Sequence, residues 1–179
     1  MNKIFEKLTN QLTETIDSSV ALALHNKNQE VEVIHLLWAL LTNTNSVLNQ
    51  LLNKMNVNKV AIELEAKSYA SKLPSVSSVT KENIKLSRNL LASLQNAEGW
   101  MASCGDKFIA VDTWLISNLD SSVIKDVLGK YVDLKEAKKE LEAMRAGKTI
   151  DSNSGDENLE ALNKYGIDLN KKAIDGLLD

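Results

Sequence analysis

The chain has 179 residues, a net charge of −3 and a pI of about 5.5, which suits one domain of ordinary size with an appendage. This near-neutral charge, without any Lys/Arg block, gives no basis for nucleic-acid binding. No stretch approaches the roughly 20 apolar residues that cross a bilayer, and the mixed N-terminus lacks the pattern of a signal peptide. We therefore expect a cytoplasmic protein that binds neither nucleic acid nor membrane.

The composition indicates an all-α fold. Hydrophobic residues, mainly Leu and Ala, make up 44% of the sequence, against one proline and seven glycines. Cys104 is the single cysteine, so an intramolecular disulfide and a cysteine-rich metal site are excluded.

An internal repeat organises the sequence. The stretch Leu8–Leu41 aligns without a gap on Leu86–Leu119, at an offset of 78 residues. Leucines meet at both ends of the alignment, and the matched apolar positions fall at helical spacing in both copies. The sequence therefore predicts two copies of one helical unit.

Four helices are predicted in the first copy, over residues 8–24, 33–41, 47–52 and 57–64. Thr9 is suited to cap the first helix, because its hydroxyl can accept a bond from a free N–H of the first turn. The second helix is apolar nearly all round, which is typical of a buried helix. A connection between the copies is predicted at Leu73–Thr80, which holds the only proline and a serine cluster.

The second copy repeats this order, with helices over residues 86–101, 111–119, 123–128 and 134–144. Gly105 is suited to the left-handed turn that ends the first of them. Trp38 and Trp114 are expected in the core, whereas Trp100 could be core or partly exposed. The two copies together predict eight helices.

After Arg145 the composition becomes small and polar, and residues 147–157 read as a flexible linker. The stretch 159–179 has apolar residues but is too short to form a core alone. We expect the chain to be a piece of a longer protein.

No catalytic or metal-binding pattern is present. The sequence lacks G-x-x-x-x-G-K-[ST], H-E-x-x-H and C-x-x-C. His25 and His35 fit capping or surface roles better than metal ligation, and Cys104 could act as a nucleophile only with a histidine beside it. Asp106 and Asp112 bracket a predicted helix start, and their spacing favours a cap or a partner for the helix dipole.

Several stretches match the sequence pattern of a known family. They are Leu8-Thr9-Asn10, Ile34–Leu41, Gly105–Ile109, Met144–Lys148, Leu162–Leu169 and Gly176–Asp179. Together they resemble the Clp N domain at the front of Hsp100 AAA+ unfoldases, and the tail is similar to the ClpB family of disaggregases. The resemblance implies a Clp N domain over 1–146, with repeat one about 1–73 and repeat two about 81–146. A linker over 147–158 and the incomplete start of a first AAA+ module over 159–179 would follow.

The resemblance also implies a function. This chain would be the substrate-binding domain of an ATP-dependent chaperone that captures exposed hydrophobic segments of unfolded or aggregated proteins. The chain itself would be a monomer without a cofactor, whereas the longer protein would be a homohexamer that uses ATP and Mg and works with the DnaK system. The alternative is an adaptor-docking N domain of a protease-coupled unfoldase of the ClpA or ClpC type.

Carried over by position, the implied substrate groove lies between the repeats. The positions that would line it are Thr9, Leu12, Leu90, Leu94, Asp106, Asp112 and Thr113. Asp112 stands where the family has a glutamate, and Thr113 where it often has an apolar residue or His. Independently of the resemblance, a seam between two half-domains is a common binding site, and an apolar floor with a carboxylate rim suits weak, promiscuous capture of polypeptide.

Overall fold

The computed structural model describes residues 3–157 and confirms the all-α prediction. Its eight α-helices are α1 (Asn10–His25), α2 (Val33–Thr42), α3 (Val47–Met55), α4 (Lys59–Ser71), α5 (Arg88–Ser103), α6 (Val111–Asn118), α7 (Ser122–Val127) and α8 (Leu134–Arg145). A 3-10 helix, η1 (Lys3–Lys7), precedes α1, and the strands β1 (Glu30–Val31) and β2 (Lys85–Leu86) pair in parallel. None of the helices in this part of the chain is long and apolar enough to cross a membrane.

The two copies begin with the same cap. The Thr9 hydroxyl accepts from the N–H of Leu12 at 3.2 Å, and the Ser87 hydroxyl accepts from the N–H of Leu90 at 3.0 Å. Both hydroxyls satisfy a first-turn donor that has no partner within the helix. The capping role predicted for Thr9 is therefore confirmed.

Each repeat also contributes a short parallel bridge to the other. Leu8 pairs with Ile109, and Val31 pairs with Leu86. The 78-residue offset exchanges these two pairs, so both joins between the repeats have the same form. The sequence did not predict the strands, because two-residue strands are too short to produce an alternating pattern.

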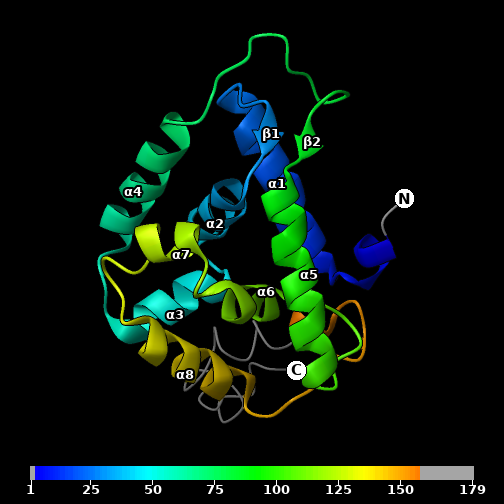
Figure 1. Ribbon diagram of the computed structural model, residues 1–179. Coiled ribbons are helices and arrows are strands. Elements are labelled where there is room, and N and C mark those ends of the chain that lie inside the picture. The colour runs from blue at the N-terminus through cyan, green and yellow to red at the C-terminus, as the bar shows by residue number, and fades with distance from the viewer. Residues whose placement is uncertain (1–2, 158–179) are drawn as a thin grey trace, which may run out of the picture.

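The core forms around α2 and α6, which lie between the long helices α1 and α5 and the outer helices (Figure 1). Every residue of α2 from Val33 to Leu41 is buried, which confirms the buried helix expected there. Trp114 is fully buried, and its indole N–H donates to the Ser93 hydroxyl at 2.9 Å. Trp38 is also core, whereas Trp100 is only partly buried.

Helices α1 and α5 end in turns of the same type, which are formed by different residues. At α5, Gly105 has φ +78°, and the N–H of Asp106 bonds the carbonyl of Met101 at 3.0 Å. At α1 the equivalent left-handed residue is Lys27, with φ 56°, and the N–H of Asn28 bonds the carbonyl of Ala23 at 2.9 Å. Glycine adopts this conformation without the steric cost that a side chain carries.

Replacing Lys27 with glycine should therefore stabilise the domain. Removing the side chain relieves a left-handed strain of roughly 1–2 kcal/mol, and the extra freedom of glycine in the unfolded chain offsets about half of this. We expect a net gain of about 0.5–1 kcal/mol, measured by urea unfolding. The reciprocal change, Gly105→Lys, should lower stability, and equal stability in both variants would contradict the strain argument.

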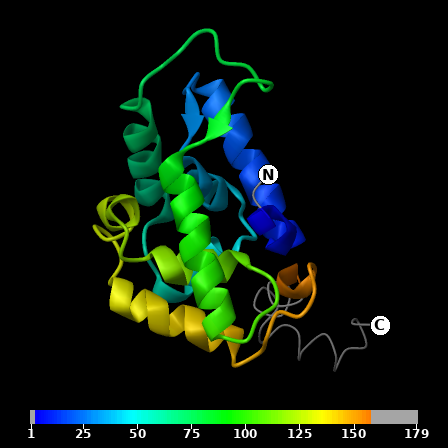
Figure 2. The ribbon, with the colours of Figure 1, turned by 45° about the vertical axis from the view of Figure 1, so that its right-hand side comes forward.

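Residues 147–157 lie against the domain, although their polar composition predicted a flexible linker. Ile150 is buried with Ala110 and Phe108, and the N–H of Asn10 donates to the carbonyl of Asn153 at 2.7 Å. Figure 2 shows this segment passing from the end of α8 towards the start of α1. A single apolar residue with backbone partners is enough to hold such a segment, and composition averaged over a window does not reveal it. Residue 158 and the predicted AAA+ start at 159–179 lie outside the described residues.

Candidate functional site

An arginine at the end of α8 brings three of the predicted site residues together. The Arg145 guanidinium donates to both carboxylate oxygens of Asp112, at 2.9 Å from Nε and 2.6 Å from Nη2. It also donates from Nη1 to Asp106 at 2.8 Å and from Nη2 to the Thr113 hydroxyl at 3.1 Å. Sequence reasoning missed Arg145, although two carboxylates beside a buried helix signal that a cation must lie near them.

This cluster is shielded from solvent. The Asp106 and Asp112 side chains are 1% and 9% exposed, and that of Arg145 is 13% exposed. Burial by itself lowers the pKa of the Arg145 guanidinium, but the hydrogen bonds and charges of Asp112, and then of Asp106, outweigh burial and raise that pKa above its ordinary value. The arginine is therefore a fixed positive charge between two buried carboxylates.

The structure corrects the capping interpretation of these two aspartates. The N-cap of α6 is Ala110, whose side chain makes no capping bond. Asp106 follows the turn that ends α5, and its Oδ1 accepts from the N–H of Ile150 at 2.9 Å. Asp112 does lie in the first turn of α6, but both of its oxygens face Arg145. Their six-residue spacing could not distinguish these arrangements, because the partner lies more than thirty residues further along the chain.

Thr9 lies apart from that cluster, at the start of α1, and contacts Asp156. Its hydroxyl donates to Oδ2 of Asp156 at 2.8 Å, and the same oxygen accepts from the N–H of Val111 at 3.2 Å. Burial raises the pKa of Asp156 to about 6, although the bonds from Thr9 and Val111 act in the opposite direction. Asp156 therefore joins the first turns of α1 and α6.

The three leucines predicted for the groove are core residues. Leu12, Leu90 and Leu94 are each 0% exposed. Their side chains lie in the hydrophobic core between the helices and offer no surface to a ligand in this conformation. Contact between them and a polypeptide remains a prediction that requires the domain to open.

A surface pocket of about 320 Å³ adjoins the Arg145 cluster. Its lining consists of Trp100, Cys104, Asp106, Asp112, Thr113, Ile116, Glu142, Arg145, Gly147, Lys148 and Thr149. Trp100 and Ile116 supply apolar surface, and the Lys138 ammonium lies 5.2 Å from the Trp100 ring centroid. The pocket thus combines apolar contacts with a charged rim. All of its lining residues belong to repeat two and the segment that follows it, whereas the predicted groove lies between the repeats.

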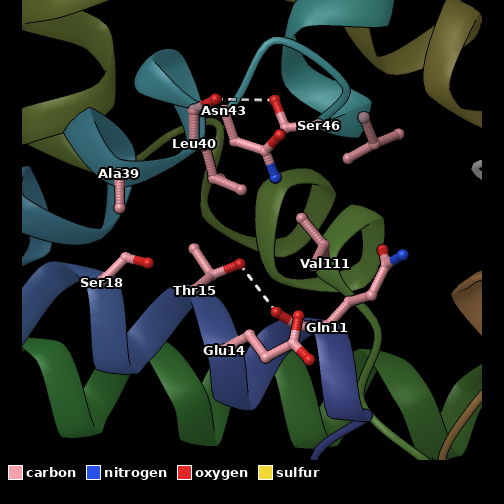
Figure 3. Close-up of a pocket in the computed structure, with 10 residues that line it drawn as sticks. Gln11, Glu14, Thr15, Ser18, Ala39, Leu40, Asn43, Ser46 and Val111 are labelled. Atoms are coloured by element: carbon pink, nitrogen blue, oxygen red, sulfur yellow. Dashed lines mark hydrogen bonds between the residues drawn. The ribbon is translucent and has the colours of Figure 1, made fainter.

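A second, smaller pocket lies between α1 and the connection from α2 to α3 (Figure 3). Gln11, Glu14 and Ser18 of α1 face it from one side, and Asn43 and Ser46 from the other. Hydroxyl, amide and carboxylate groups make up most of this lining, and Ala39, Leu40, Val47 and Val111 add apolar surface from α2, α3 and α6.

His35 has a structural role, in line with the capping role considered for it. Its Nδ1 accepts from the N–H of Glu32 at 2.8 Å, and its Nε2 lies 2.8 Å from Oδ1 of Asn28. Burial lowers the pKa of His35 to about 4, so the ring is neutral at pH 7. Across residues 3–157, no cluster of His, Cys, Asp and Glu side chains could hold a metal ion.

Comparison with known proteins gives close relatives. Chaperone protein ClpB of Wolinella succinogenes is 55% identical over 175 residues, which cover 98% of this chain and 20% of the relative. The chain thus spans about one fifth of the length of that protein. The Hsp104 N-terminal domain from Candida albicans shares the fold, with a TM-score of 0.75 and 22% identity over 84% of this chain and 99% of that one.

Another solved structure with this fold is a complex of the ClpV N-domain with a VipB peptide. It has a TM-score of 0.62 and 17% identity, and the match covers 82% of this chain and 91% of that chain. The family model described as the Clp repeat N-terminal domain matches residues 7–131, which hold repeat one and most of repeat two. The chain therefore belongs to the Clp repeat N-terminal domain family.

Proposed function

We propose that this chain is the substrate-binding domain of a ClpB-type chaperone and that it captures exposed hydrophobic segments of unfolded or aggregated proteins. The observation that carries the proposal is the pocket in which Trp100 and Ile116 lie beside the Arg145 cluster. Apolar surface next to fixed charges can hold an apolar side chain and orient the polar backbone around it.

The rigidity of the pocket's charged side supports this proposal. Arg145 is held by two carboxylates and by Thr113, so its geometry costs little further ordering when a ligand binds. An unfolded client, in contrast, must be ordered on binding, and affinity should be on the order of 10 μM or weaker. Weak capture suits a domain that must release its clients.

The rest of the proposed activity belongs to a longer protein. The 179 residues contain no phosphate-binding loop, so the groups that would hold ATP and Mg are not in this chain. The likeness to ClpB supports a parent that is a hexameric ATPase acting with the DnaK system. That likeness also favours the chaperone function over docking of a folded adaptor, the alternative left open by the sequence.

Binding can be tested with a fluorescent, permanently unfolded polypeptide, followed by anisotropy. Trp100→Ala should weaken binding about tenfold, because truncating a central aromatic residue removes much of an apolar contact. Leu64→Ala is the matched control, since Leu64 is 60% exposed on α4, away from this pocket. It removes apolar surface without touching the site.

An equal loss of affinity in both variants would mean that the polypeptide binds exposed apolar surface non-specifically and not at this pocket. If the unmodified chain binds no unfolded polypeptide but does bind a folded adaptor, the chaperone proposal is wrong and the adaptor alternative replaces it. Unfolding curves of both variants separate a binding defect from a loss of stability.

A further inference from the structure

The segment 148–156, which we call the strap, contacts the Arg145 cluster near its first residues and Thr9 at its last. The N–H of Ile150 donates to Asp106, and the N–H of Lys107 donates to the Ile150 carbonyl at 2.8 Å. Further along, Asp156 accepts from the Thr9 hydroxyl. The strap therefore touches two of the residues predicted to bind polypeptide and covers the starts of α1 and α6 (Figure 2).

Comparison of the two repeats shows what the strap replaces. In repeat one, the N-terminus of α2 is capped by residues next to it in the sequence, because Glu32 and His35 form a reciprocal capping box. The equivalent N-cap in repeat two is Ala110, which has no capping group. The carboxyl of Asp156 supplies the missing acceptor to the N–H of Val111. The first turn of α6 is thus capped by a carboxyl group that comes from a distant part of the chain.

The strap is also held independently of the main core. Ile150 packs with Ala110 and Phe108, in a small cluster separate from the large one that holds the helices together. The second oxygen of Asp156, Oδ1, is buried and has no hydrogen-bond partner among the described residues. These anchors, with the backbone bonds to Asn10, Asp106 and Lys107, attach the strap to the surface of the helical core, so the strap can be released without unfolding the helices.

We propose that the strap is a built-in competitor of the client and that client segments bind in its place. This inference rests on the proposed function. The surface under the strap fits a peptide that turns as residues 152–157 do, placing an apolar side chain against Ala110 and Phe108 and, six residues later, a carboxyl group at Thr9 and Val111. Two backbone N–H groups, those of Asn10 and Lys107, pair with its main chain as they now pair with the strap.

Competition lowers the apparent affinity of the client by the fraction of time for which the site is open. Ile150→Ser removes the apolar anchor, and Asp156→Ala removes the carboxyl. Each change in the 179-residue chain should tighten binding of the unfolded polypeptide, by about tenfold if the strap is closed nine-tenths of the time. Glu157→Ala is the matched control, because Glu157 is the exposed carboxylate next to Asp156, and it should leave binding unchanged.

A second measurement uses a labelled peptide with the sequence of residues 147–157. It should bind the Ile150→Ser variant more tightly than the unmodified chain, and the unlabelled peptide should displace the client from that variant. Unchanged client affinity in both strap variants, with no displacement by the peptide, would overturn the inference. If no variant binds client but the peptide still binds the opened site, the strap is confirmed and the proposed function fails. Circular dichroism checks that both variants keep their helices.

Discussion

Arg145→Ala should destabilise the domain by about 3–5 kcal/mol, because it leaves two buried carboxylates without their cation. The Asp106 side chain is 1% exposed and the Asp112 side chain 9%, so water cannot replace the lost partner without rearrangement. For a domain of this size the melting temperature should fall by roughly 10 °C. Thermal unfolding followed by circular dichroism measures this change.

Two further variants test the cause. Arg88→Ala removes the other arginine of the sequence, which is exposed at the start of α5, and should change stability by less than about 0.5 kcal/mol. Adding Asp106→Asn and Asp112→Asn to Arg145→Ala should recover part of the lost stability, because the buried charges are gone. If the triple variant is no more stable than Arg145→Ala, unpaired charge is not the reason for the loss.

Leu94→Gln should cost about 4 kcal/mol of stability, since it buries an amide where the structure has a fully enclosed leucine. The resemblance placed Leu94 in the client groove, where the same change would remove an apolar contact and leave stability intact. The 0% exposure of Leu94 predicts the opposite order of effects. Urea unfolding and client anisotropy on the same samples separate the two outcomes.

Leu94→Met serves as the matched control, because a change that conserves volume in a packed core costs less than about 1.5 kcal/mol. A Leu94→Gln variant with unchanged stability and weaker client binding would return Leu94 to the groove. It would also show that the helices around it open in solution.

The sequence alone determined the helices and their repetition. The four-residue spacing of the leucines and the 78-residue offset predicted all eight helices, because an amphipathic helix records its buried face in its own residues. The caps at Thr9 and Gly105 were predicted for the same reason, since a helix terminus selects its residue through bonds within one or two turns.

Only the tertiary structure decided which side chains meet. Asp106 and Asp112 looked like caps until the end of α8 brought Arg145 between them, from more than thirty residues away in the chain. Ile150 and Asp156 stand in a polar stretch whose composition predicts no contact, yet they find partners at the starts of α6 and α1. A pattern along the chain reports which face of a helix is buried, but it does not report what covers that face, because the covering residues are chosen by the packing of distant elements.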